Sequence, residues 1–244
     1  LGGRVRRLSP STRMAAWSHR AADDGLARRI AASLGVSEPL AFVLARAFPD
    51  EGEAERHLRP QLAQVSDPFA VGGLREAAER LVAAVAKDEP IAILGDYDVD
   101  GVSSTAMLVH FLRRLGGRPA FFVPRRLEEG YGLSMAALER VLAEARPRLF
   151  VALDCGTNSQ PEVERLKAEG VDVIVVDHHV AKETRAACLL VNPRVHDAED
   201  APWQSLCTAG LVFKLIHGIL KVLRLAGDER GVRIAVKDYL DLAA

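Results

Sequence analysis

The chain has 244 residues, of which 49% are hydrophobic and 27% charged, and its formal net charge is −1. This length is enough for one large or two small domains with a substantial core. No stretch approaches the roughly 18 uninterrupted apolar residues of a membrane span, so we expect no membrane association. The near-neutral charge predicts no general basic face, so any contact with nucleic acid must come from a local patch.

The ends of the chain and its cysteines give further expectations. The Arg-rich N-terminus is not followed by an apolar segment with a small-residue cleavage site, so it does not resemble a signal peptide. Cys155, Cys188 and Cys207 are odd in number and form no C-x-x-C pair, which predicts a reduced, cytoplasmic setting. The chain begins at Leu1 and stops within a helical pattern at residues 242–244, so we expect a piece of a longer protein.

The pattern of apolar residues changes twice along the chain. Residues 1–20 are rich in Arg and Ser without a clear period, which predicts a flexible arm. Residues 21–88 carry Ala, Leu and Arg at helical spacing and predict an N-terminal helical region. Residues 89–244 alternate short apolar runs with helical patterns. Buried strands that alternate with helices predict an α/β fold, with a parallel sheet flanked by helices.

The individual elements of this third region can be assigned from the same patterns. Ser134 and Ser159 are candidate N-caps, and Gly116 and Gly117 are expected to end a helix. The expected strands cover residues 91–94, 120–123, 149–153, 171–176 and 189–191, and the expected helices cover 102–115, 134–145, 159–169, 208–225 and 232–244.

Side chains of the types that bind metals follow three of these strands. They are Asp96, Asp98 and Asp100 after the first, Asp154 after the third, and Asp177, His178 and His179 after the fourth. In an open parallel sheet ligands bind outside the carboxyl ends of the strands, so we expect these groups to converge. Carboxylates gathered in one place repel one another unless cations neutralise them. The sequence therefore predicts a site for divalent metal ions.

Each group taken alone has an ordinary explanation. Asp96, Asp98 and Asp100 match the opening of an EF-hand loop, but Met107 stands where that loop needs Glu. An acidic turn would also account for these three residues. Asp154 alone could be a helix cap. Only the three groups together favour a metal site.

Read together, three segments resemble the first three motifs of the DHH phosphoesterase family. They are Asp-Tyr-Asp-Val-Asp-Gly at 96–101, Asp-Cys-Gly at 154–156 and Asp-His-His at 177–179. Residues 67–69, 124–133, 191–194 and 209–215 further resemble the branch of this family that degrades single-stranded DNA from its 5′ end. The resemblance covers about residues 40–244.

The resemblance implies a catalytic domain over residues 89–244 with two metal ions, Mn²⁺ or Mg²⁺. The implied metal ligands are Asp96, Asp98, Asp100, Asp154 and His178, with Asp154 bridging both ions. His179 and Arg126 would contact substrate phosphate, and Asp177 would orient the histidines without binding a metal itself. The implied catalytic residues are Asp154, His179 and Asp177. Cys155 lies in the cluster, but no base is arranged to activate its thiol, so we interpret it as a small residue beside a glycine turn.

The implied function is metal-dependent phosphodiester hydrolysis, as a 5′-to-3′ exonuclease on single-stranded DNA in recombination and repair, with other repair proteins as further partners. Two alternatives stay open. One is a small-substrate member of the family, acting on short RNA, nucleotide 3′-phosphates or cyclic dinucleotides. The other is a non-catalytic scaffold. The family carries a further metal-binding Asp and a second domain that we do not find here, so we expect this chain to be weakly active or inactive alone.

Overall fold

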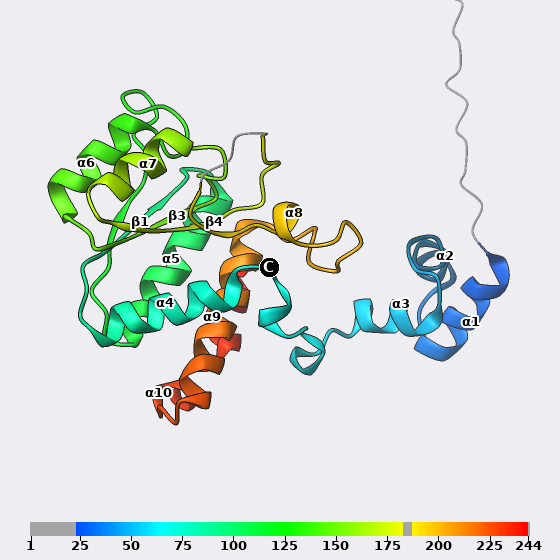
Figure 1. Ribbon diagram of the computed structural model, residues 1–244. Coiled ribbons are helices and arrows are strands. Elements are labelled where there is room, and N and C mark those ends of the chain that lie inside the picture. The colour runs from blue at the N-terminus through cyan, green and yellow to red at the C-terminus, as the bar shows by residue number, and fades with distance from the viewer. Residues whose placement is uncertain (1–22, 183–186, 244) are drawn as a thin grey trace, which may run out of the picture. The chain divides into compact units, whose positions relative to one another are not determined.

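The computed structural model describes residues 23–182 and 187–243 (Figure 1). The predicted flexible arm, residues 1–20, lies outside the described residues. The chain divides into two compact units between Val65 and Ser66.

The first unit is a small helical cluster. Asp23 caps its first helix by accepting hydrogen bonds from the N–H groups of Gly25 and Leu26. The buried residues of its core are Leu26, Ile30, Leu34, Ala41, Leu44 and Ala54. Its elements are α1 (Asp24–Leu34), α2 (Glu38–Ala47), α3 (Glu51–Leu58) and the short 3₁₀ helix η1 (Leu62–Gln64).

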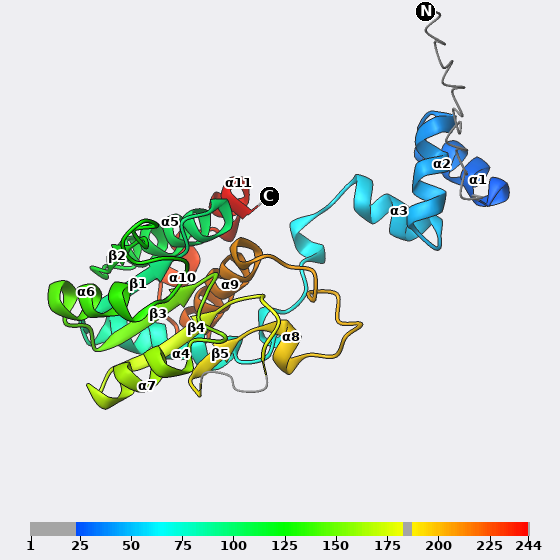
Figure 2. The same cartoon turned by 90° about the horizontal axis from the view of Figure 1, so that it is seen from above.

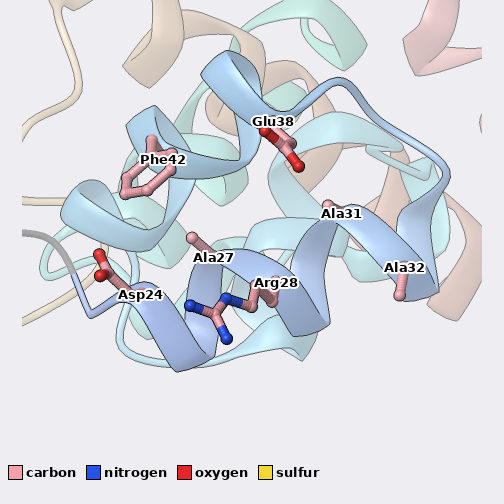
Figure 3. Close-up of a pocket in the computed structure, with 7 residues that line it drawn as sticks. All are labelled: Asp24, Ala27, Arg28, Ala31, Ala32, Glu38 and Phe42. Carbon is pink, nitrogen blue, oxygen red and sulfur yellow. The ribbon is translucent and has the colours of Figure 1, made fainter.

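A shallow pocket lies between α1 and α2, where Ala27, Ala31 and Phe42 line it together with charged side chains (Figure 3). Among the described residues no single helix is long and apolar enough to cross a membrane. The pair α1 and α2, bent by 119°, passes that criterion jointly, by length and composition only.

The second unit is built on a parallel five-stranded sheet with the order β2-β1-β3-β4-β5. The central strands β1 and β3 are buried along their whole length, as their unbroken apolar runs predict. All five strands lie where the sequence predicts them, within a residue or so. They are β1 (Ile91–Gly95), β2 (Ala120–Phe122), β3 (Leu149–Leu153), β4 (Asp172–Val176) and β5 (Leu189–Val191).

Helices cover both faces of this sheet (Figure 1). On one face lie α6 (Met135–Ala145) and α7 (Gln160–Ala168), which pack with Ala92, Leu94 and other alternate strand residues. The opposite face is covered by α4 (Leu74–Ala86), α5 (Val99–Arg114) and α9 (Thr208–Leu225). The predicted α/β fold is confirmed. Figure 2 shows the strands running side by side between these helices.

The shorter elements are η2 (Pro68–Ala70), α8 (Pro193–His196), α10 (Arg230–Arg233), η3 (Val236–Tyr239) and α11 (Leu240–Ala243). The single helix predicted at 232–244 is therefore wrong. Ile234 and Ala235 adopt extended backbone angles, and Ile234 is buried, so the chain bends there to place an apolar side chain in the core.

Two further local expectations can be compared with the structure. Ser134 caps α6 as predicted and accepts a hydrogen bond from the N–H of Ala137 at 3.3 Å. Ser159 does not cap α7, because its hydroxyl donates to the carbonyl of Leu133 instead, at 3.2 Å. The predicted helical region 21–88 includes α4, but α4 packs against α9 within the second unit.

Candidate metal centre

The turn between β1 and α5 brings its first carboxylate into the protein. Asp96 follows β1 directly and is fully buried. Its Oδ1 accepts a hydrogen bond from the N–H of Tyr97 at 2.7 Å, whereas its Oδ2 is buried with no hydrogen-bond partner among the described residues. A Cβ atom on Gly101 would lie 2.4 Å from the carbonyl oxygen of Asp96, so only glycine permits the turn to close this tightly. A buried carboxylate oxygen without a donor is costly, which points to a cation as its partner.

The next two carboxylates lie at the start of α5. Asp98 is its N-cap and accepts from the N–H of Gly101 at 3.0 Å. Asp100 lies in the first turn, and its two oxygens accept from the N–H groups of Thr208 and Ala209 at 2.8 and 2.6 Å. Asp100 thus links the start of α5 to the start of α9, an arrangement that the sequence did not predict.

Asp154 lies directly after β3, in the middle of the sheet edge. Its φ of +61° is in the left-handed region, and its N–H donates to the carbonyl of Val176 at 3.0 Å. Its side chain is buried, and its Oδ1 accepts from the hydroxyl of Thr208 at 2.9 Å. Burial raises the pKa of Asp154 to about 7, with the charges of Asp100 and Asp98 adding to this effect and the Thr208 hydroxyl opposing it. A bound cation would offset the cost of burying the charged carboxylate and would lower its pKa.

The segment after β4 is organised by Asp177, which is buried. Its Oδ1 accepts from the backbone N–H groups of His178 and His179 and lies 2.7 Å from Nδ1 of His179, while its Oδ2 accepts from the N–H of Thr157. Burial would raise the pKa of Asp177, but the bonds from Thr157 and His179 lower it below its usual value. The same bond to Asp177 raises the pKa of His179 against the opposing effect of burial.

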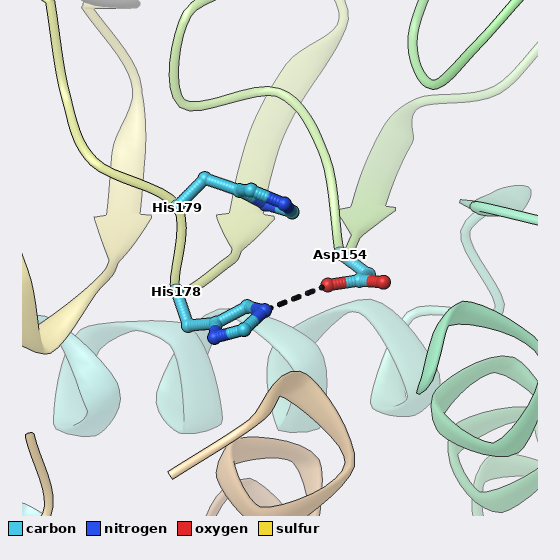
Figure 4. Close-up of side chains that lie close together, drawn as sticks. All are labelled: Asp154, His178 and His179. Carbon is cyan, nitrogen blue, oxygen red and sulfur yellow. Dashed lines mark ion pairs between the residues drawn. The ribbon is translucent and has the colours of Figure 1, made fainter. Parts of the chain in front are cut away.

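The side chains that follow β1, β3 and β4 converge in the structure, as the sequence predicts. Nε2 of His178 lies 3.4 Å from Oδ1 of Asp154 (Figure 4) and 3.7 Å from Oδ2 of Asp100. Two groups of side chains have ligand atoms within 4.8 Å of one another and could each hold an ion. They are Asp96, Asp98 and Asp154, and Asp154, His178 and His179. Asp154 is common to both groups, and carboxylates with imidazole suit Mn²⁺ or Mg²⁺ better than a soft ion.

Thr157, Asn192 and Thr208 also support this centre; none of them was predicted from the sequence as a site residue, although Asn192 lies in the segment 191–194 that resembles the family. All three are buried polar residues. Nδ2 of Asn192 donates to Oγ1 of Thr157 at 3.0 Å and to the carbonyl of His179 at 2.9 Å, so it joins the segments after β3, β4 and β5. The position of Asn192 directly after the fifth predicted strand could have drawn attention to it. Thr208 begins a helix far along the chain, and no local pattern distinguishes it.

Arg126 lies apart from the carboxylates. Its guanidinium carbon is 5.4 Å from the ring centroid of Tyr97, and the ring of Tyr97 meets that of Tyr131 edge-on at 5.7 Å. Arg126 is exposed, whereas the neighbouring Arg125 pairs with Glu128 at 3.1 Å. Burial and the carboxylate of Asp96 raise the pKa of Tyr131, so its phenol stays protonated.

A pocket of about 500 Å³ opens beside the metal centre. Tyr131, Asp154, Asn158, His179 and Lys182 are among the residues that line it. Cys155 also borders this pocket, but it belongs to the apolar core beneath the sheet edge, and burial raises the pKa of its thiol well above the usual value. A buried, protonated thiol is a poor nucleophile, which agrees with its interpretation as a structural residue.

Comparisons with known proteins identify the family. The chain is 32% identical to the single-stranded-DNA-specific exonuclease RecJ of Bacillus subtilis over 84% of its own length and 26% of the relative's. It is 36% identical to RecJ of Dickeya dadantii over 90% of its own length and 39% of the relative's. The chain thus spans between about a quarter and two fifths of these relatives.

Solved structures agree with the sequence comparisons. The structure of RecJ in complex with Mn²⁺ from Thermus thermophilus superposes with a TM-score of 0.68 at 30% identity, covering 90% of this chain and 29% of that one. The resemblance inferred from the sequence motifs is therefore confirmed. The N-terminal domain of the DHH family matches residues 90–244, well over half of the chain, and the chain belongs to the DHH family.

Proposed function

We propose that this chain carries the metal-binding part of a phosphodiesterase, most specifically an exonuclease that degrades single-stranded DNA from the 5′ end. The observation that carries the proposal is the gathering of Asp96, Asp98, Asp154 and His178 from three strand ends, with one oxygen of Asp96 buried and unpaired among the described residues. A protein without a metal would gain nothing from keeping this repulsion. The RecJ relatives are named as single-stranded-DNA-specific exonucleases, and structures of RecJ from Thermus thermophilus are complexes with Mn²⁺ or Mg²⁺.

We assign the metal ligands to Asp96, Asp98, Asp154 and His178, with Asp154 serving both ions because it belongs to both groups of side chains. Asp100 completes the proposed set. Each of its oxygens accepts one amide N–H and retains a second lone pair, so bonding to α9 is compatible with a ligand role. When bound, two divalent ions supply an activated water and stabilise negative charge on the leaving oxygen.

The remaining residues position the substrate in this proposal. Asp177 accepts a hydrogen bond from Nδ1 of His179 and raises the pKa of the ring, and the protonated ring can donate from its other nitrogen to the scissile phosphate. Arg126 is exposed and lies over the face of Tyr97, so its guanidinium can bind a phosphate of the strand. The 5′-to-3′ direction, a role in recombination and repair with other repair proteins, and a cytoplasmic location are proposed from the resemblance to RecJ.

A cleavage assay tests this function. Single-stranded DNA labelled at either end and a dinucleotide are incubated with Mn²⁺ and an excess of the chain, so that weak activity is also measured. We expect shortening from the 5′ end, none with EDTA, and none with Asp154→Ala. Preferred cleavage of the dinucleotide would favour a small-substrate enzyme, and failure to bind Mn²⁺ would favour a scaffold. Rapid multiple turnover by the 244-residue chain would contradict the expectation that it is weakly active alone.

A further inference from the structure

The start of α9 is fixed by a residue from a distant part of the chain. Cys207 is the N-cap of α9 but makes no side-chain capping bond. The first two N–H groups, of Thr208 and Ala209, are instead received by the two oxygens of Asp100, which lies 108 residues before Thr208. Bonds between a carboxylate and the free N–H groups of a helix start are strong and directional. The first residue of α9 is thereby held at a defined place beside the metal centre.

The side chain of Thr208 continues this connection to Asp154. Thr208 is fully buried, and its hydroxyl donates to Oδ1 of Asp154 at 2.9 Å. The backbone of Asp154 is already fixed by its bond to the carbonyl of Val176, which leaves rotation of the carboxylate as its main freedom. Thr208 is buried and its N–H is bonded to Asp100, so its hydroxyl, bonded to one oxygen of Asp154, restricts that rotation.

Resting on the function proposed above, we propose that Thr208 is a positioning residue, whose hydroxyl holds the carboxylate of Asp154 in the orientation that binds metal. In that orientation the carboxylate has ligand atoms of Asp96, Asp98 and His178 within 4.8 Å. The hydroxyl uses one lone pair of Oδ1, and the remaining lone pairs of the carboxylate stay available to cations. Groups that hydrogen-bond a metal ligand in this way typically contribute about 10- to 100-fold in metal affinity or activity.

The simpler alternative is that Thr208 only satisfies a buried polar pair and stabilises the fold. Metal affinity separates the two, since a purely structural residue changes the melting temperature but not the affinity of the folded protein for Mn²⁺. Thr208→Val keeps the branched shape and removes the hydroxyl, Thr208→Ala removes it without the bulk, and Thr208→Ser restores it. Ser104→Ala is the matched control, because Ser104 is also a buried helical hydroxyl and has no hydrogen-bond partner among the described residues.

The experiment measures Mn²⁺ binding to the 244-residue chain and its variants by the electron paramagnetic resonance of free Mn²⁺, with metal-free melting curves to verify folding. We expect Thr208→Val and Thr208→Ala to weaken Mn²⁺ binding by about 10-fold or more, Thr208→Ser to restore it, and Ser104→Ala to leave it unchanged. Wild-type affinity in either folded variant that lacks the hydroxyl would overturn the inference and leave the proposed function standing. A wild-type chain that does not bind Mn²⁺ would refute the metal site, and the positioning role with it.

Discussion

Replacing Asp154 by Asn should stabilise the metal-free protein while weakening its response to metal. Only 2% of the Asp154 side chain is exposed, and burial together with Asp100 and Asp98 raises its pKa from 3.8 to about 7. Between these pH values the folded protein holds a proton that the unfolded chain has released. The free energy of unfolding therefore falls as the pH rises from about 4 to about 7, and the loss is complete above pH 7.

The size of the effect follows from the pKa difference. A pKa of about 7 in place of 3.8 corresponds to about 4 kcal/mol at pH 8. This figure is the upper limit of the gain in the Asn variant, because the buried amide must also be desolvated. For a chain of this length 1 kcal/mol shifts the melting temperature by roughly 2–4 °C. The Asp154→Asn variant should thus melt several degrees above the wild type in EDTA at pH 8, and at nearly the same temperature at pH 4.

Thermal melts of Asp154→Asn and the wild type, in EDTA and in Mn²⁺ at pH 4 and pH 8, test this reasoning. Saturating Mn²⁺ should stabilise the wild type by an amount that grows with the ratio of free metal to Kd, and should reverse the order of the two proteins at pH 8. Asp200→Asn removes an exposed carboxylate and serves as the control. An Asn variant that is less stable than the wild type in EDTA at pH 8 would show that the buried carboxylate cluster is not under electrostatic strain.

Three further predictions concern neighbouring residues. Gly101→Ala places a Cβ atom 2.4 Å from the backbone of Asp96 and should lower the free energy of unfolding, measured in denaturant titrations, by about 3 kcal/mol. Gly52→Ala in α3 is the control: its Cβ atom meets only side-chain atoms, at 3.3 and 3.7 Å, and should change the free energy of unfolding by less than about 1 kcal/mol. Arg126→Ala should weaken binding of single-stranded DNA, reduce the salt dependence of binding by about one phosphate contact and leave Mn²⁺ affinity unchanged. Arg125→Ala, which loses a surface pair with Glu128, should have no effect on DNA binding, and equal DNA affinities of Arg126→Ala and the wild type in fluorescence anisotropy would contradict the assignment. Asp177→Ala removes the acceptor of four hydrogen bonds and should cost about 3 kcal/mol at pH 5 to 6. Because the folded pKa of Asp177 is lowered and that of its partner His179 is raised, this difference should be largest between their usual pKa values of 3.8 and 6.5, and a difference lost already at pH 6 would refute that cause.

The fold and the place of the site were largely predictable because both depend on local patterns. Unbroken apolar runs such as Leu149–Leu153, when they alternate with helical patterns, are typical of the inner strands of a parallel sheet. Once the strands are parallel, their carboxyl ends share one edge, so Asp96, Asp154 and His178 had to approach one another. The predicted helix at 232–244 failed because burial of Ile234 outweighed the local helical preference.

The sequence by itself determined which residue types lie at the carboxyl ends of the strands, since short-range apolar spacing places the strands, and their alternation with helices makes the sheet parallel. Only the tertiary structure decided how those residues are held. The bonds from Thr208 and Ala209 to Asp100, and from Thr208 to Asp154, join positions that are 54 to 109 residues apart. Such contacts depend on the packing of α9 against α5, and side-chain packing between distant elements leaves no periodic pattern along the chain.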